Sequence, residues 1–213
     1  MRTKTMSTQD YISLTKEPFG DAPLVFAFHG TGGDEHQLFG LARELLPEAG
    51  VIAPRGDVSE MGAARFFRRT GEGIYDMDDL ARATGKVTSF VEAWTTRLGD
   101  RPVCGFGYSN GANILASVMM ARPDLFDRVG LLHPLIPWAP GPVPALAGTE
   151  ILITAGRHDP ICPWPLTQQL VDWSEAQNAR VVTEFHDGGH ELRREEAAAL
   201  ARFLRASPAQ EAA

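Results

Sequence analysis

Gly107-Tyr108-Ser109-Asn110-Gly111 is the stretch of this sequence that decides the fold. Residues 102–106 before it are mostly apolar and predict a buried strand, and residues 112–121 after it carry apolar side chains at helical spacing. The glycines leave room for a tight turn, in which side chains would collide with the neighbouring strand and helix. We therefore predict a strand, a sharp turn that carries a serine, and then a helix.

The rest of the chain alternates short apolar runs with amphipathic ones. We expect strands at residues 24–28, 51–53, 128–132, 150–154 and 181–185, and helices at 35–46, 78–98, around 166–173 and at 191–204. This alternation predicts an α/β fold, in which a mainly parallel sheet carries helices on both faces.

Composition narrows the class of protein. A length of 213 residues with 44% hydrophobic content suits a single domain over residues 1–213. The net charge of -7 argues against a nucleic-acid-binding surface.

No apolar run approaches the roughly 20 residues that cross a membrane, and residues 1–10 lack the apolar core of a secretory signal. We expect a cytoplasmic protein without stable membrane insertion. Its two cysteines, Cys104 and Cys162, do not make a disulfide framework.

Two stretches fall outside the regular pattern. Residues 55–75 are long for a connection between a strand and a helix, and residues 134–148 hold five prolines. Both follow strands, at the end of a parallel sheet where binding sites form. They either shape a pocket or are plain surface loops.

A serine hydroxyl is a weak nucleophile, so Ser109 needs a neighbouring base, which in turn needs an acid to orient it. A serine on such a turn is the nucleophile elbow of α/β-hydrolases, in which the acid and then the base follow along the chain. His190 lies in a glycine-containing loop beyond the last expected strand, whereas His186 ends that strand, so we expect His190 to be the base. Asp159 lies in the turn after residues 150–154 and is the expected acid.

The negative charge that develops on an attacked carbonyl needs preorganised N–H donors. Asn110 follows the serine at the start of a helix and supplies one expected donor. We assign the second donor to Thr31, because it lies in a glycine-rich loop after an early strand. His29 comes too early in the chain to be the base and is expected to brace this loop. A phosphate-binding loop is the rival interpretation, but its G-x-x-x-x-G-K-[ST] pattern is absent.

Together these motifs resemble the phospholipase/carboxylesterase family of α/β-hydrolases, which includes acyl-protein thioesterases and small bacterial carboxylesterases. The resemblance covers nearly the whole chain and rests on residues 29–35, 107–111, 156–161 and 188–190. Residues 65–69 and 72–76 are similar to the bacterial subgroup of hydroquinone-linked hydrolases. Asn110 stands where the thioesterase branch has glutamine, which disfavours protein deacylation.

The resemblance implies an α/β-hydrolase fold with a minimal lid and acyl transfer to water, without a metal or an organic cofactor. Ser109 would attack an ester carbonyl, His190 would take its proton, and the Thr31 and Asn110 amides would hold the oxyanion. The leading hypothesis is a serine carboxylesterase for small soluble esters. The alternatives are a lysophospholipase or acyl-thioesterase with the same Ser109, Asp159 and His190, and, in another class, a non-catalytic binding protein on this fold.

Substrate recognition leaves alternatives open. Arginines at 65, 68 and 69 form a positive cluster, in which Arg65 and Arg69 are candidates to bind a substrate carboxylate. Asp76, Asp78 and Asp79 lie close by in the sequence, so structural ion pairs are the other explanation. Phe66 and Tyr75 are candidates to line an acyl or aryl pocket, although core packing is the alternative.

The oligomeric state is also open. Trp138 and Trp164 lie in proline-rich neighbourhoods, where they are either exposed contacts of a homodimer or buried pocket walls.

Overall fold

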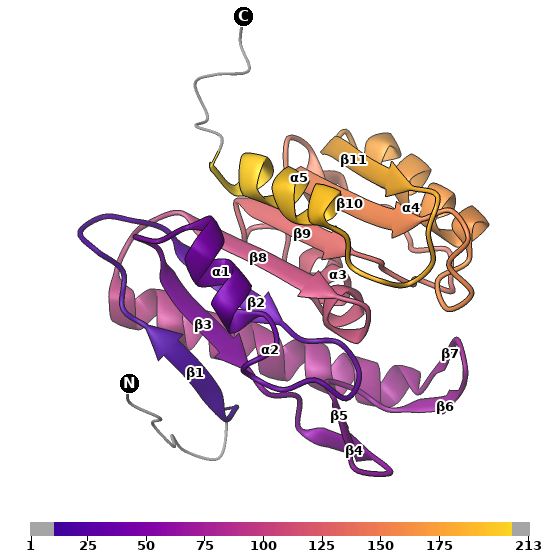
Figure 1. Ribbon diagram of the computed structural model, residues 1–213, viewed down its shortest axis with the longest axis horizontal. Helices are drawn as coiled ribbons and strands as arrows, with labels where there is room; N and C mark the ends of the chain where they lie inside the picture. The colour runs from indigo at the N-terminus through magenta and orange to yellow at the C-terminus, as the bar shows by residue number, and fades with distance from the viewer. Residues whose placement is uncertain (1–10, 206–213) are drawn as a thin grey trace, which may run out of the picture.

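The computed structural model in Figure 1 describes residues 11–205, and the expected domain ends, residues 1–10 and 206–213, lie outside the described residues. Its centre is a seven-stranded sheet, in the order β1-β3-β2-β8-β9-β10-β11. The strands are β1 (Ser13–Lys16), β2 (Leu24–Phe28), β3 (Gly50–Pro54), β8 (Val103–Tyr108), β9 (Arg128–Leu132), β10 (Glu150–Gly156) and β11 (Arg180–His186). β1 pairs antiparallel with β3, and all other neighbours pair parallel.

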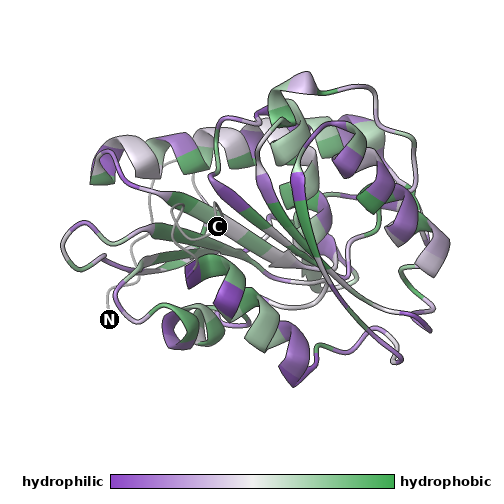
Figure 2. Cartoon of the chain, turned by 90° about the horizontal axis from the view of Figure 1, so that it is seen from above, coloured by the Kyte–Doolittle hydropathy of each residue, from purple (hydrophilic) through white to green (hydrophobic). Residues whose placement is uncertain are grey.

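Helices cover both faces of the sheet, as Figure 2 shows from above. One face carries α1 (Phe39–Leu45) and α5 (Arg194–Arg205), and the other carries α2 (Met77–Leu98), α3 (Asn110–Ala121) and α4 (Trp164–Ala176). β2 is buried along its whole length, because its side chains point alternately into two hydrophobic cores, one on each face of the sheet. Phe26 packs on the side of α2 and α3, whereas Val25 and Ala27 pack on the side of α1 and α5.

The connection at residues 55–75 is more ordered than the sequence indicates. It forms two small antiparallel hairpins, β4 (Val58–Glu60) with β5 (Ala63–Arg65), and β6 (Arg69–Gly71) with β7 (Ile74–Tyr75). α2 then begins after Asp76, whose side chain accepts a hydrogen bond from the Asp79 N–H at 3.0 Å and so caps the helix. In residues 134–148 the structure has one 3-10 turn, η1 (Pro144–Leu146).

Two local expectations differ from the structure. β1 was not expected, because it contributes only one large buried side chain, Leu14, and joins the sheet through its backbone. α1 begins at Phe39, whereas a helix from residue 35 was expected. The preceding residues form turns, in which Asp34 Oδ1 accepts the His36 N–H and the Asp34 carbonyl accepts the Gln37 N–H.

Candidate active site

The serine turn is fixed by direct contact between backbones. Ser109 lies between β8 and α3 with φ 52°, a left-handed conformation that side chains rarely adopt. A Cβ atom on Gly107 would lie 2.4 Å from the Gly111 backbone, and a Cβ atom on Gly111 would lie 2.0 Å from the Phe28 carbonyl oxygen. The start of α3 therefore packs against the end of β2 at a distance that only glycine permits, and the strained turn presents Ser109 at the edge of the sheet.

The structure brings the expected nucleophile, base and acid together. Ser109 Oγ lies 3.0 Å from His190 Nε2, and His190 Nδ1 lies 2.7 Å from Asp159 Oδ2. Asp159 follows β10 and His190 follows β11, so adjacent parallel strands deliver the acid and the base to the same end of the sheet. His186 is not part of this chain of hydrogen bonds, since its Nε2 faces Glu196 Oε2 at 3.1 Å.

Asp159 is held as a carboxylate. Its Oδ1 accepts hydrogen bonds from the Ile161 and Cys162 N–H groups at 2.8 and 2.9 Å. Burial alone would raise the pKa of Asp159, but hydrogen bonds from His133, His190 and these two amides hold it well below its usual value. An ionised Asp159 orients His190 with its Nδ1 protonated and leaves Nε2 free to accept a proton from Ser109.

His133 is a functional-site residue that the sequence did not reveal. It directly follows β9 and is fully buried, with its Nδ1 2.8 Å from Asp159 Oδ2 and its Nε2 3.0 Å from Glu196 Oε1. Glu196, in the first turn of α5, is also fully buried. The signal that indicates His133 is its position directly after the apolar run 128–132, where parallel strands deliver site residues.

The two expected oxyanion donors face the serine. Thr31, Ser109 and Asn110 line one cavity of about 40 Å³. Neither the Thr31 N–H nor the Asn110 N–H donates to another atom within residues 11–205. Their side chains are held elsewhere: Thr31 Oγ1 accepts from Arg65 Nη1 at 2.7 Å, and Asn110 Oδ1 accepts from the Phe66 N–H at 2.8 Å. Both amides thus remain available to an oxyanion in the cavity.

His29 braces the loop that carries Thr31. Its Nδ1 donates to the Gly30 carbonyl at 2.7 Å, and its Nε2 accepts from the Gly56 N–H at 2.8 Å. Burial lowers the pKa of His29, so the ring stays neutral and keeps both of these roles.

The candidate substrate-binding residues divide into two groups. Arg65, Arg69 and Tyr75 line the cavity beside Ser109. Tyr75 is held in place, because its hydroxyl donates to the Leu135 carbonyl and accepts from Asn113 Nδ2. Phe66 requires a correction: its ring is fully buried and packs against aromatic side chains of the core, namely Tyr11, Phe28 and His29, so only its backbone reaches the site.

Ion pairs account for part of the arginine cluster. Arg68 lies 3.2 Å from both Asp76 and Asp79 and is not among the cavity-lining residues. Arg69 Nε lies 2.9 Å from Glu60 Oε1, and Arg65 Nη1 lies 3.4 Å from Glu60 Oε2. Two cavity arginines therefore share one carboxylate, whereas Arg68 is a structural cation.

Known proteins resemble this chain along most of its length. MhqD of Bacillus subtilis (strain 168), which is named as a hydrolase, is 36% identical over 176 residues, 82% of this chain and 88% of MhqD. The chain belongs to the phospholipase/carboxylesterase family of α/β-hydrolases. No family model matches the sequence.

Solved structures agree with this membership. Atu2452 of Agrobacterium tumefaciens, a protein of unknown function, is 50% identical with a TM-score of 0.87 over 93% of this chain and 98% of its own. The Bacillus cereus carboxylesterase is 34% identical with a TM-score of 0.86 over 91% and 93%. YahD, solved with malic acid, is 25% identical with a TM-score of 0.85 over 92% and 98%. The predictions of an α/β-hydrolase fold and of a carboxylic ester hydrolase are confirmed.

Within the part of the chain that the structure describes, two groups of side chains have the composition of metal ligands. They are His133 with His186 and Glu196, and His133 with Asp159 and His190. Both nitrogens of His133 and Nδ1 of His190 lie 2.7 to 3.0 Å from carboxylate oxygens, so these side chains already contact one another directly. The expectation that catalysis needs no metal stays a prediction.

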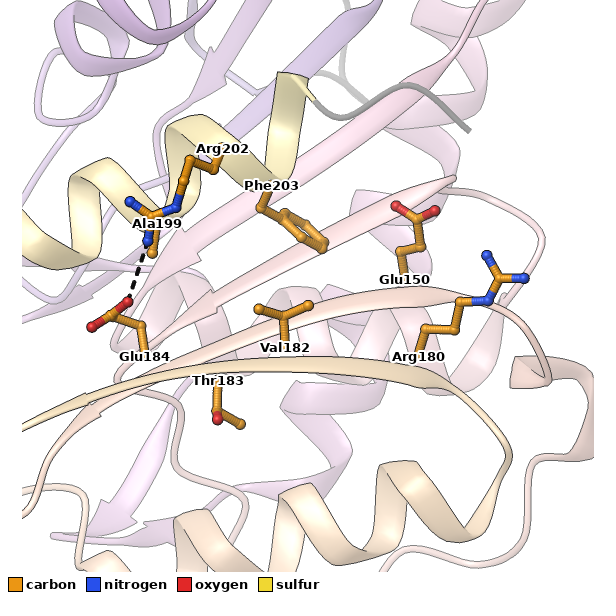
Figure 3. Close-up of a pocket in the computed structure, with 8 residues that line it drawn as sticks. All are labelled: Glu150, Arg180, Val182, Thr183, Glu184, Ala199, Arg202 and Phe203. Carbon is orange, nitrogen blue, oxygen red and sulfur yellow. Dashed lines mark hydrogen bonds and ion pairs between the residues drawn. The ribbon is translucent and has the colours of Figure 1, made fainter. Parts of the chain in front are cut away.

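A larger groove of about 350 Å³ lies between β11 and α5 (Figure 3). It is lined by Val182 and Phe203, with an ion pair of 3.4 Å between Arg202 and Glu184 at one end. None of the residues expected in catalysis lines it. Chemistry, rather than volume, therefore identifies the smaller cavity at Ser109 as the candidate active site.

Within residues 11–205, no helix is long and apolar enough to cross a membrane.

The close approach at Gly111 predicts a sharp effect of one methyl group. Gly111→Ala would push α3 away from β2, and we expect a loss of about 3 kcal/mol or more in the free energy of unfolding. Gly85→Ala is the matched control, because Gly85 is exposed within α2 and its added Cβ would meet nothing within 4 Å. That variant should gain about 0.5–1 kcal/mol. Urea unfolding measures both, and equal stability of Gly111→Ala and the parent protein would contradict the packing described.

Proposed function

We propose that this protein is a serine carboxylesterase that hydrolyses small soluble esters through an acyl-enzyme on Ser109. The observation that carries the proposal is the continuous chain of hydrogen bonds from Ser109 Oγ to His190 and from His190 to Asp159, at 3.0 and 2.7 Å. It ends beside a cavity lined by Thr31 and Asn110, whose backbone N–H groups donate to no other atom among residues 11–205.

The geometry gives each group a step. Ser109 Oγ attacks the ester carbonyl carbon while its proton passes to His190 Nε2. The carbonyl oxygen becomes an oxyanion and accepts hydrogen bonds from the Thr31 and Asn110 amides, which strengthen as its charge develops. His190 then protonates the leaving alcohol, and the acyl group stays on Ser109. In the second half, His190 activates a water molecule that releases the carboxylic acid.

Small substrates are favoured by the size of the site. The cavity of about 40 Å³ is walled by residues of the hairpin segment, such as Arg65, Arg69 and Tyr75. These walls are polar, which suits a soluble ester better than the long acyl chain of a lysophospholipid. The similarity to the Bacillus cereus carboxylesterase supports the same choice over an acyl-thioesterase. The hydrogen-bonded alignment of Ser109, His190 and Asp159, the candidate triad, disfavours a non-catalytic binding protein. A cytoplasmic location and a homodimer stay predictions.

We further propose that the ester carries a carboxylate, which Arg69 and Arg65 recognise. Arg65 is almost fully buried at the cavity wall, and burial lowers its pKa, which shows how little water surrounds its charge. A substrate carboxylate would supply the negative charge that Glu60 alone does not provide to both arginines. The structure of the similar protein YahD with malic acid, a dicarboxylic acid, supports this choice of ligand.

Replacement of the nucleophile tests the proposed chemistry. Ser109→Ala should lower kcat for p-nitrophenyl esters by on the order of 10⁴-fold or more, because no other group can form the acyl-enzyme. A panel of acyl lengths should show the highest kcat/KM of the parent protein for short chains. Unchanged turnover in the variant would refute the mechanism, whereas a preference for long acyl chains or thioesters would support the lysophospholipase or thioesterase alternative.

Charge recognition predicts a selective change in KM. Arg69→Ala should raise KM about 10-fold for esters that carry a carboxylate and less than about twofold for neutral esters of similar size, since one charge-assisted contact is lost. Arg68→Ala is the matched control, because Arg68 pairs with Asp76 and Asp79 outside the cavity. Steady-state kinetics on paired esters measures the difference, and an equal rise in KM for both esters would exclude carboxylate recognition.

A further inference from the structure

The carboxylate of Asp159 serves two imidazole rings at once. Its Oδ2 lies 2.7 Å from His190 Nδ1 and 2.8 Å from His133 Nδ1, and the two rings are 5.1 Å apart between centroids. His133 is fully buried, and the mechanism above assigns it no step. The base of the candidate triad therefore competes with a second ring for the same oxygen.

Glu196 faces the other side of His133 and is held as a carboxylate. Its Oε2 accepts from the Arg193 N–H at 2.8 Å, as glutamate does in the first turn of a helix, and lies 3.1 Å from His186 Nε2. Its Oε1 accepts from Thr154 Oγ1 at 2.6 Å and faces His133 Nε2 at 3.0 Å. Although burial raises the pKa of Glu196, hydrogen bonds from His133, Thr154 and the Arg193 N–H outweigh burial and leave that pKa below its usual value. The groups around Glu196 thus favour its ionised form.

The positions of the two carboxylates determine the protonation of His133. A neutral imidazole has one unprotonated nitrogen, which would face an ionised oxygen at 3.0 Å or less on either side. With both nitrogens protonated, each faces an opposite charge. Burial lowers the pKa of His133, but Asp159 and Glu196 outweigh burial and raise it to about 9. The two facing carboxylates therefore favour the imidazolium form of His133 at neutral pH.

The backbone holds this ring in place. His133 has φ 51°, its N–H donates to the Thr154 carbonyl at 2.9 Å, and its carbonyl accepts from Cys162 Sγ at 3.2 Å. A left-handed conformation at a side chain as large as histidine is strained and marks a position fixed by its surroundings.

We propose that His133 is a positioning residue of the triad, a buried imidazolium that takes up part of the charge of Asp159 and so limits how tightly His190 holds a proton. The proposal rests on the proposed function, since it assigns His190 as the base. Without the charge of His133, Asp159 would stabilise the protonated form of His190 more strongly. His190 would then stay protonated up to a higher pH than in the parent protein, and Ser109 would lack its base over that added range.

The other groups around the two rings do not offset this effect. Tyr108 packs 5.3 Å from His190, and burial raises its pKa to about 12, so it stays neutral. The carboxylate of Glu191 is turned away, to the Gly189 N–H and to Arg193. His186, 5.6 Å from His133, accepts the Gly188 N–H at Nδ1, and its Nε2 faces Glu196 Oε2. Asp159, 2.7 Å from His190 Nδ1, and His133, 5.1 Å from His190 between ring centroids, are therefore the groups whose charges act on His190 in this proposal.

The substitution His133→Asn removes the charge of His133 but keeps a hydrogen-bond donor to Asp159. An asparagine amide places an N–H donor close to the position of Nδ1, and asparagine tolerates a positive φ better than most residues. We expect the acid limb of the kcat/KM profile for a p-nitrophenyl ester to move at least about one pH unit upward, with kcat at the optimum retained within about tenfold.

His158→Asn is the matched control, because His158 lies next to Asp159 in the chain but is exposed, with its Nδ1 directed to the Asp187 carbonyl. Its acid limb should stay in place. A folded His133→Asn variant whose acid limb also stays in place, whatever its kcat, would overturn the proposal, because a merely structural role predicts no shift.

A second measurement needs neither the variant nor activity. Long-range ¹⁵N–¹H NMR of the parent protein should show one buried histidine, assigned to His133 through its backbone resonances, with both ring nitrogens protonated until the pH approaches about 9. A neutral His133 ring at pH 7 would overturn the proposal even if His133→Asn does not fold. This readout also separates the proposal from the proposed function, which fails only if Ser109→Ala keeps its turnover.

Discussion

The contact between Gly111 and the carbonyl oxygen of Phe28 is the constraint on which the site depends. It joins the start of α3 to the end of β2 at a distance that excludes any side chain. The Asn110 amide lies at this start, and the loop that bears Thr31 begins at this strand end. One backbone contact therefore fixes the spacing between the candidate nucleophile and the two candidate oxyanion donors. Such preorganisation is what an oxyanion site needs, because its donors must be in place before charge develops.

Buried charge is the second constraint. Asp159, His133 and Glu196 are each at most a few per cent exposed, and an unpaired charge at such a depth would be strongly destabilising. The positive charge of His133 lies between the negative charges of Asp159 and Glu196, so each charge faces one of opposite sign. It also ties α5 to the ends of β9 and β10, since Glu196 contacts both His133 and Thr154. The helix α5 is thus part of the support of Asp159, the candidate catalytic acid.

The sequence was sufficient for the features that local chemistry encodes. The Gly107–Gly111 pattern and the buried strand at residues 24–28 each depend on residues close together in the chain, and Asp159 and His190 were each indicated by a position just beyond an expected strand. The expected oxyanion pair likewise came from local positions, Asn110 directly after Ser109 and Thr31 in the glycine-rich loop after an early strand. Asp76 as the cap of α2 and the inner stripe of that helix follow from the same local rules.

What the sequence did not reveal depends on distant contacts. β1 is a strand because β3 offers it a free edge, and no periodicity in four residues could show that. Phe66 was a candidate for the pocket, but the register of the hairpin segment turns its ring into the core. His133 and Glu196 are far apart in the chain and acquire their role only when β9 and α5 meet. Glu196 carries no pattern that singles it out, and the signal for His133 is limited to its position directly after the apolar run 128–132.

Covalent labelling tests the central claim most directly, namely that Ser109 is a nucleophile activated by His190. The protein would be treated with an alkyl fluorophosphonate, which forms a stable bond to an activated serine, and then examined by intact-mass and peptide mass spectrometry. The account predicts one phosphonyl group per chain, located on Ser109, and none in Ser109→Ala. Labelling of another residue, or no label on a protein that hydrolyses esters, would contradict it.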